Sequence, residues 1–313
     1  MSITVLRPGL QTTIQSRPRT GLRHFGVPSS GAADPLSLAL ANKLVGNAWH
    51  VPALEAALLG PTLRIDVPCA FALTGANAVS TLNGDPVAMH ETLFAEAGDV
   101  LAIGAAEIGA RTYLAVAGGL AADAILGSGS TYLPAAIGGY RGRAVEEGDR
   151  LSIVRAGAEW LRTPAEFQVP VTSSWAVRAC TSFEIDILDE EGRDRLFDTN
   201  WTIGRRADRM GLQLEGQVLD VASDGRMPSA AVFPGTVQCP EGGLPFVLAV
   251  DAGTVGGYPR VAQVTRADRH LLGQLRPGDH LRLLLRDTES AGVELRAKHQ
   301  YWHEWLEDID EII

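Results

Sequence analysis

Residues 26–47, GVPSSGAADPLSLALANKLVGN, join a glycine- and serine-rich loop to a helix with two marked ends, and they constrain the fold more than any other stretch. Asp34 followed by Pro35 is typical of a helix start, because the carboxylate caps a backbone N–H and proline needs no hydrogen bond at the first position. Apolar residues recur at helical spacing until Gly46, which tolerates the left-handed backbone of a helix end. We therefore expect a helix over 35–45.

The loop before this helix brings hydroxyl and N–H groups to the helix N-terminus. Ser29 and Ser30 lie in the loop, and Asp34 follows them at the cap. The helix dipole and the exposed N–H groups both favour negative charge, so this location suits an anion or a polarised carbonyl. The same pattern also fits a core helix behind a tight loop.

Length and composition limit the class of protein. A chain of 313 residues is too long for one typical core, so we expect two domains. The formal net charge of −10 argues against nucleic acid as a partner, because there is no basic surplus to neutralise phosphates. Three widely spaced cysteines fit a reducing cytoplasm rather than a disulfide framework. We find no signal-peptide core and no apolar segment of membrane length, and we predict a soluble cytoplasmic protein with no membrane partner.

Short apolar and β-branched runs between turns predict a mainly β fold with a few helices. Asn83-Gly84 is a strong hairpin signal, and residues 51–59 are expected to form a second, shorter helix. A strand, a glycine-rich loop, a Gly-Asp turn and another strand follow one another over 113–154, and the same succession returns over 247–285. This echo indicates two related β-rich modules, although common turn chemistry also produces such a pattern.

The echo divides the chain into two β-barrel modules and a tail. We place the N-terminal module, including the 35–45 helix, at residues 1–160 and the C-terminal module at 175–290. Residues 291–313 are expected to form an amphipathic helix. His299 and His303 have a spacing that can ligate a metal, but no third ligand lies nearby in sequence, so we predict no metal site. The aromatic residues of the tail suit packing or an interface with another chain.

Four glycine-bearing polar segments are candidates for chemistry. They are the serine loop, the 127–143 segment with Arg143, the 201–211 segment with Asp208 and Arg209, and the 251–260 segment that begins at Asp251. Each also fits tight β corners or surface ion pairs. None supplies a histidine base or an obvious nucleophile, and no P-loop motif occurs. The segments together favour a site that positions a small anionic or amide substrate electrostatically.

In this order the segments resemble the family known as the 5-oxoprolinase C subunit, KipI antagonist, or the carboxyltransferase domain (subdomains A and B) of urea carboxylase and urea amidolyase. The matching stretches run from GLRHFGVPSSGAADPLSLALANKLVGN through IGGYRGRAVEEGD and DRMGLQLEG to FPGTVQCPEGGLPFVLAVDAGTVGGYP and QLRPGDHL, and cover roughly residues 5 to 287. The resemblance implies two tandem cyclophilin-like β-barrel modules.

For function, the resemblance implies one component of an ATP-dependent 5-oxoprolinase that opens 5-oxo-L-proline to L-glutamate, with a KipI-like protein and a LamB/YcsF-like protein as its two partner subunits. ATP would be shared with those partners, and the assembly allows a homo-oligomer. A second branch implies the carboxyltransferase component of a biotin-dependent urea or amide carboxylase of allophanate-type metabolism. A third implies a regulatory protein that binds a KipI-like partner. The only lysines, Lys43 and Lys298, lie outside an Ala-Met-Lys-Met-like hairpin, so no biotin is expected on this chain.

The resemblance also implies a site. Its candidate catalytic residues are Ser29, Ser30, Asp34 and Asp251, and its candidate substrate-binding residues are Arg143, Asp208, Arg209, Gln238, Thr254, Gly256, Gly257 and Tyr258.

Overall fold

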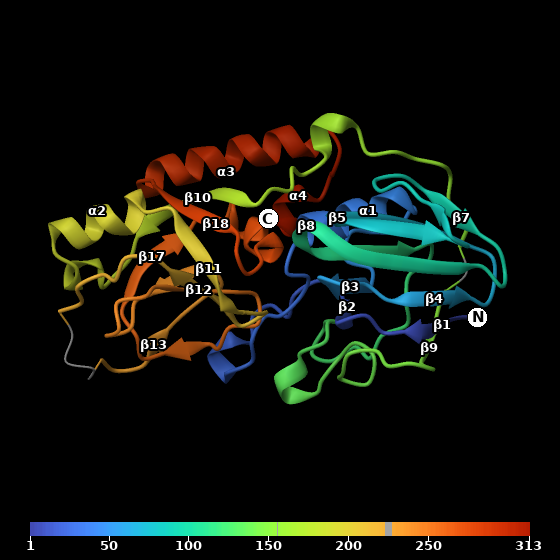
Figure 1. Cartoon of the computed structure of the whole chain (residues 1–313), viewed down its shortest axis with the longest axis horizontal. Coiled ribbons are helices and arrows are strands. Elements are labelled where there is room, and N and C mark those ends of the chain that lie inside the picture. Colours follow the sequence, from blue (N-terminus) through green and yellow to red (C-terminus); the bar gives the residue numbers. More distant parts are fainter. Residues whose placement is uncertain (155, 223–226) are drawn as a thin grey trace. The chain divides into compact units, whose positions relative to one another are not determined.

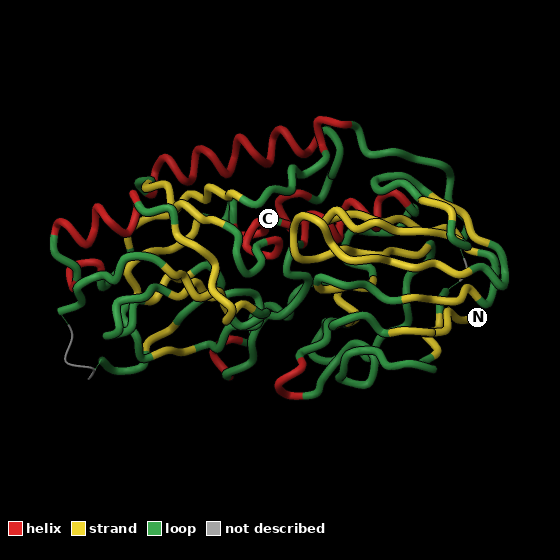
Figure 2. The backbone as a smooth tube through the Cα atoms, in the orientation of Figure 1, coloured by secondary structure: helices red, strands yellow, loops and turns green. Residues whose placement is uncertain are grey.

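The computed structural model describes residues 1–154, 156–222 and 227–313 (Figure 1). Strands dominate and helices are few, as predicted (Figure 2). The chain folds into two compact units. Unit 1 comprises residues 1–19, 30–171 and 302–312, and unit 2 comprises residues 20–29, 172–301 and 313. The loop that precedes the first helix is therefore split between the units, with Ser29 in unit 2 and Ser30 in unit 1.

Unit 1 contains a nine-stranded sheet with the order β2-β3-β8-β4-β1-β9, and β5 pairs with β6, β7 and β8. This strand order does not close on itself within the described chain, so the sheet remains an open barrel-like layer. Helix α1 packs on β5 and β8. The strands are β1 (Ser2–Arg7), β2 (Gln11–Gln15), β3 (Ala53–Ala57), β4 (Thr62–Ile65), β5 (Cys69–Leu82), β6 (Asp85–Pro86), β7 (Leu93–Ala95), β8 (Val100–Val116) and β9 (Arg150–Ser152), and α1 spans Pro35–Leu44.

Small side chains allow α1 to lie close to this sheet. Leu38, Ala41 and Leu44 of the helix pack in one buried cluster with alanines of the two longest strands, among them Ala72 and Ala115. A second cluster collects the alternating apolar residues of the sheet's other face. The helix start is as predicted, because Pro35 occupies the first turn and the Asp34 side chain accepts a hydrogen bond from the Ser37 N–H.

Unit 2 is a closed seven-stranded barrel with the order β10-β17-β14-β15-β12-β11-β18, and it closes through parallel pairing of β10 with β18. A two-stranded ribbon, β13 with β16, stands beside it. The elements are β10 (Ser174–Thr181), α2 (Glu190–Asp198), β11 (Trp201–Ala207), β12 (Gly211–Glu215), β13 (Ala230–Ala231), β14 (Thr236–Gln238), β15 (Phe246–Leu248), β16 (Val255–Gly256), β17 (Arg260–Val264), β18 (His280–Leu285) and α3 (Thr288–His303). The described chain also contains five short 3-10 helices: η1 (Arg23–Phe25), η2 (Leu133–Ala135), η3 (Ala165–Phe167), η4 (Ile185–Ile187) and η5 (Arg269–Gln274).

The Gly-Asp turns noted in the sequence share one structure. Each aspartate accepts a hydrogen bond from the backbone N–H three residues earlier, over 2.7 Å at Asp149 and 3.2 Å at Asp279. The preceding glycines, Gly148 and Gly278, have φ of 85° and 92°, which favours glycine. In both units the glycine N–H donates to a strand carbonyl, of Val5 or Ile203, and that residue's N–H donates back to the aspartate carbonyl. The turn of residues 96–99 has the same aspartate bond, over 2.7 Å.

Two expected helices differ from the structure. Residues 51–59 hold strand β3, which pairs with β2 and β8. The expected helix over 291–313 is two helices, because α3 ends at His303 and α4 (Ile309–Ile312) follows after a turn. By contrast, the Asn83-Gly84 hairpin is confirmed, with both residues at positive φ between paired β5 and β6.

The aromatic residues at the end of α3 and directly after it pack within unit 1. Trp302 is 6% exposed, and its ring centroid lies 5.5 Å from that of Phe167. Trp305 stacks on the same ring at 6.2 Å. The tail aromatics therefore contribute to a folded core rather than forming one free apolar face. Within the described residues, no helix has both the length and the apolar composition needed to cross a membrane.

Candidate functional site

The predicted site residues are divided between the two units. Unit 1 holds Ser30, Asp34 and Arg143. Unit 2 holds the others, which are Ser29, Asp208, Arg209, Gln238, Asp251, Thr254, Gly256, Gly257 and Tyr258.

Ser30 has two features of a functional residue. Its φ is 51°, a left-handed backbone conformation that is strained for a residue other than glycine. The side chain is 1% exposed, and its hydroxyl has no hydrogen-bond partner among the described residues. No base is therefore bonded to the hydroxyl, so it is not an activated nucleophile of the Ser-His type. It can still donate a hydrogen bond to a carbonyl oxygen or an oxyanion.

Asp34 is fully buried as the cap of α1. Its Oδ1 accepts from the Ser37 N–H over 3.1 Å, and its Oδ2 accepts from the Ser37 hydroxyl over 2.5 Å. The Asp34 N–H donates to the Tyr113 hydroxyl, which in turn donates to Glu55, each over 2.8 Å. This carboxylate therefore fixes the helix start.

Glu55, Arg111 and Tyr113 form a buried polar network that the sequence analysis missed. Glu55 accepts from the Ala33 N–H over 2.9 Å, and its other oxygen lies 3.3 Å from Arg111 Nε. The pKa of Tyr113 is raised well above its ordinary value, first by burial and then by the nearby Glu55 carboxylate. The network ties the end of the serine loop to β3 and β8. Its only signal in the sequence is a glutamate inside the apolar run ALEAA.

Arg143 forms an ion pair with the aspartate of a Gly-Asp turn. Its two terminal nitrogens bind the Asp149 carboxylate over 2.7 and 2.8 Å. This hydrogen-bonded guanidinium lowers the pKa of Asp149. The 127–131 segment is held to the chain after β2, since the hydroxyls of Ser128 and Ser130 donate to the Arg17 carbonyl over 2.6 and 3.1 Å. The charge of Arg143 is therefore already balanced within unit 1.

In unit 2 the structure brings Arg209 and Asp251 together. Arg209 Nε and Nη2 bind the two carboxylate oxygens over 2.7 and 3.0 Å, and the two residues are 5% and 2% exposed. The Asp251 N–H also donates to the Arg209 carbonyl over 2.7 Å. Asp208, a predicted substrate-binding residue, accepts hydrogen bonds from the N–H groups of Met210 and Gly211. The third and fourth polar segments thus meet through a buried bidentate ion pair.

This ion pair anchors the glycine-bearing loop that carries the remaining candidates. The Val232 N–H donates to the Thr254 carbonyl over 3.2 Å, beside the β13–β16 ribbon. Gln238 is 5% exposed and donates to the Tyr258 carbonyl over 3.0 Å. A Cβ at Gly256 would lie 2.7 Å from the Gln238 amide nitrogen, so a larger residue there would force the Gln238 side chain to move. Gly257 and the 56%-exposed Tyr258 side chain are left at the surface of the loop.

Arg23 reaches this loop and was missed by the sequence analysis. Its Nη2 donates to the carbonyls of Val232 and Gly253 over 2.6 and 2.8 Å. Its Cζ lies 5.4 Å from the centroid of the Phe233 ring. Its Nε and Nη1 are buried and have no hydrogen-bond partner among the described residues. The signal in the sequence is an arginine in the loop of residues 21–31, where the serines are the more conspicuous polar residues.

Other possible centres on the described chain do not match the predicted chemistry. Burial raises the pKa of Cys69 to about 11 and that of Cys239 to about 12, so neither thiol is a nucleophile at neutral pH. The described residues contain no group of three or more His, Cys, Asp or Glu that could hold a metal ion. His299 Nε2 instead lies 2.7 Å from the Ile313 carbonyl oxygen.

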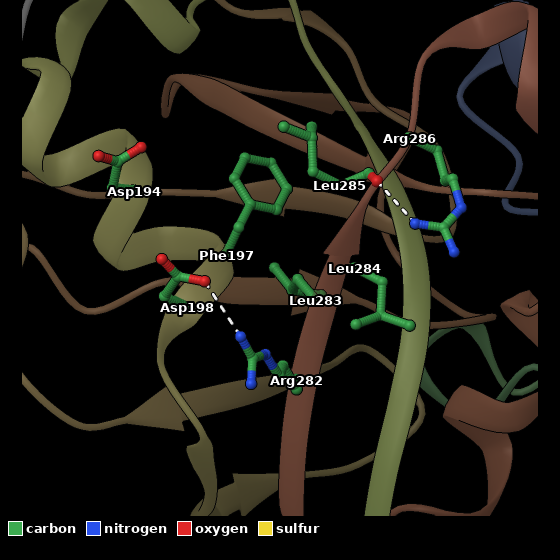
Figure 3. Close-up of a pocket in the computed structure, with 8 residues that line it drawn as sticks. All are labelled: Asp194, Phe197, Asp198, Arg282, Leu283, Leu284, Leu285 and Arg286. Atoms are coloured by element: carbon green, nitrogen blue, oxygen red, sulfur yellow. Dashed lines mark hydrogen bonds and ion pairs between the residues drawn. The ribbon is translucent and has the colours of Figure 1, made fainter.

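A shallow pocket lies between α2 and β18 (Figure 3). Asp198 at its edge pairs with Arg282 over 3.0 Å, and Arg286 donates to the Leu285 carbonyl over 2.8 Å. None of the predicted site residues lines this pocket. The loops around Arg209, Asp251 and Arg23 therefore remain the candidate site of unit 2, and the Ser30 loop remains that of unit 1.

Comparison with known proteins gives a consistent family. The sequence model described as "Carboxyltransferase domain, subdomain A and B" matches residues 25–285. The 5-oxoprolinase C subunit of Escherichia coli is 35% identical over 306 residues, which cover 97% of each chain. The urea amidolyase of K. lactis has a similar structure, with a TM-score of 0.89 and 29% identity over 96% of this chain. The urea carboxylase of Kluyveromyces lactis gives the same TM-score and identity. This chain spans 20% of the urea amidolyase and 29% of the urea carboxylase.

Proposed function

We propose that this chain is the C subunit of an ATP-dependent 5-oxoprolinase. The premise is that the chain belongs to the family of carboxyltransferase domains with subdomains A and B. The observation that carries the proposal is the similarity to the E. coli protein of that name along 97% of both chains. The reaction would convert 5-oxo-L-proline, ATP and two molecules of water to L-glutamate, ADP and phosphate.

The chemistry needs positioned hydrogen-bond donors more than a nucleophile. A lactam carbonyl is unreactive, and transfer of the ATP γ-phosphoryl group to the amide oxygen would activate it for attack by water. Donors aimed at the oxygen that gains charge stabilise such a step. The unbonded Ser30 hydroxyl is suited to this role, with Ser29 beside it in the sequence.

We assign the charged candidate residues mainly to holding loops in place, and not to binding the substrate. A substrate anion would meet Arg143 or Arg209 only in competition with Asp149 or Asp251. We therefore infer that Asp34 holds the start of α1 behind the serine loop, and that Asp251 holds the loop on which Thr254, Gly256, Gly257 and Tyr258 are presented. Asp208 and Gln238 support loops of unit 2 through hydrogen bonds to the backbone.

The proposal includes partners and location. A KipI-like protein and a LamB/YcsF-like protein would complete the enzyme as the other two subunits, with ATP shared among the three in the cytoplasm and no biotin on this chain. Similarity to a protein named as one subunit of 5-oxoprolinase supports a multi-subunit enzyme.

Reconstitution tests the proposal directly. The chain is mixed with its two candidate partners, and ATP-dependent release of L-glutamate from 5-oxo-L-proline is measured. Ser30→Ala should lower turnover by about 10²–10³-fold, the size expected for loss of one oxyanion donor. Ser173→Ala, at an exposed loop position of unit 2, is the matched control and should retain activity. Full glutamate release without this chain would refute the proposal.

The structural similarity to urea amidolyase and urea carboxylase favours carboxyl transfer to urea as the second candidate. That function predicts that product formation needs bicarbonate and a biotin carrier from another chain, whereas 5-oxoprolinase activity needs neither. The regulatory alternative predicts a stable complex with a KipI-like protein. Its test should avoid Trp302, since that side chain packs on Phe167 and its removal would also weaken the fold.

A further inference from the structure

The side chain of Arg23 has an incomplete set of partners. Arginine has five N–H donors, and the two on Nη2 of Arg23 reach the carbonyls of Val232 and Gly253. The donors on Nε and Nη1 are shielded from solvent and meet no acceptor among the described residues. Shielded donors without an acceptor are unfavourable, so a water or an anion that reaches these two nitrogens would stabilise the arrangement.

A second arginine of unit 2 strengthens the case for an anion. Burial lowers the pKa of Arg269, and the nearby charges of Arg266 and Arg23 lower it further. Within the part of the chain that the structure describes, no carboxylate forms an ion pair with Arg23 or Arg269. By contrast, the guanidinium groups of Arg209 and Arg260 in the same unit bind the carboxylates of Asp251 and Glu184.

The surroundings of Arg23 fit a carboxylate better than a phosphate. Two backbone carbonyl oxygens flank its Nη2, and they would repel a multiply charged group. Phosphate sites usually offer several backbone N–H groups at a helix N-terminus, and the 3-10 turn at 23–25 is too short to be one. The Phe233 ring beside the guanidinium supplies a flat apolar surface, and it is 52% exposed.

We propose that Arg23, supported by Arg269, binds the carboxylate of a small lactam substrate at the 232–254 loops of unit 2. This inference rests on the proposed function for the choice of substrate, because 5-oxo-L-proline carries a carboxylate beside its lactam and urea carries none. Arg23 would then be the residue that distinguishes these two substrate classes.

Binding to the full chain and to the reconstituted complex tests the inference. Calorimetry compares 5-oxo-L-proline with 2-pyrrolidinone, the same lactam without a carboxylate, and with inorganic phosphate. We expect 5-oxo-L-proline to bind at least about tenfold more tightly than 2-pyrrolidinone, as is typical when a charge-assisted hydrogen bond is lost. Arg23→Gln should remove this preference, and in the complex it should raise KM for 5-oxo-L-proline more than it lowers kcat.

Two further variants keep the result interpretable. Arg269→Gln should weaken carboxylate binding without removing the Arg23 contacts to the loop, which covers the case in which Arg23→Gln does not fold. Arg282→Gln, at an exposed ion pair of the same unit, should leave binding unchanged.

Several outcomes decide the matter. Equal binding of the two lactams, unchanged binding by Arg23→Gln, or no carboxylate binding to either the chain or the complex would overturn the inference. Tighter binding of phosphate, lost in Arg23→Gln, would overturn the carboxylate assignment. Arg23-dependent binding of acetate or succinate without 5-oxo-L-proline binding would support the carboxylate site and reject the proposed function.

Discussion

The buried pair of Arg209 and Asp251 offers a direct test of whether these residues hold the site together. Asp251→Leu removes a 2%-exposed carboxylate and leaves the 5%-exposed Arg209 guanidinium without the two oxygens that it binds at 2.7 and 3.0 Å. Removing one partner of a buried ion pair typically costs about 3–5 kcal/mol. Replacing both partners by apolar residues usually costs far less, so Arg209→Met combined with Asp251→Leu should recover most of the loss.

A double-mutant cycle measures this coupling. Urea unfolding of the wild-type chain, the two single variants and the double variant should give a coupling free energy of at least about 1 kcal/mol, as is usual for residues in contact. Hydrogen exchange of the Asp251 N–H, which donates to the Arg209 carbonyl, reports the same effect locally in unit 2. Additive effects of the two substitutions, or a cost below about 1 kcal/mol for Asp251→Leu, would refute the positioning role.

Three further predictions concern single residues. Burial lowers the pKa of His90 to about 4 in the folded chain. As the pH falls from about 6.5 towards 4, the His90 imidazole is therefore protonated in the unfolded chain but not in the folded one. Stability should therefore decrease between about pH 6.5 and pH 4, by up to about 3 kcal/mol, and urea titrations of His90→Asn should show a smaller decrease. Cys69 and Cys239 should resist alkylation by iodoacetamide at about pH 7.5 in the native chain, as mass spectrometry would show, and rapid labelling would contradict their raised pKa values. Asp34→Ala should cost about 1–2 kcal/mol in urea unfolding through loss of the helix cap, Asp34→Ser should cost less, and equal costs would exclude capping as its main role.

The parts of the fold that follow from local sequence were predictable. Asp34-Pro35 specifies a helix start, and Asn83-Gly84 specifies a tight hairpin, because neighbouring residues alone supply the needed hydrogen bonds and φ angles. The Gly-Asp turns belong to the same class. The predicted helix at 51–59 was wrong because pairing between distant strands, and not local sequence, decides the structure there. Its ALEAA core favours a helix by intrinsic propensity, but pairing with β2 on one side and β8 on the other overrides that preference.

The candidate site was predictable as a set of segments and not as a set of contacts. Arg209 and Asp251 are separated by 42 residues, and Arg23 and Gly253 by 230. No periodicity or spacing in a single sequence relates residues so far apart. Glu55 was likewise hidden, because its partners Tyr113 and Arg111 lie on another strand.

Arg143 and Arg209 differ from Arg23 in their hydrogen-bond partners, and this difference decides which arginine is available to bind an anion. In the sequence, Arg143 and Arg209 are the natural candidates for an anion because glycines and polar residues surround them. In the structure each already binds an aspartate through two hydrogen bonds, so a substrate carboxylate there would have to displace an equally good partner. Arg23 faces no such competition, since its bonds go to neutral carbonyls and its other donors have no acceptor within the described chain. A bound carboxylate at Arg23 would gain a charge-assisted bond without breaking an existing ion pair, and anion recognition in unit 2 is therefore assigned to Arg23.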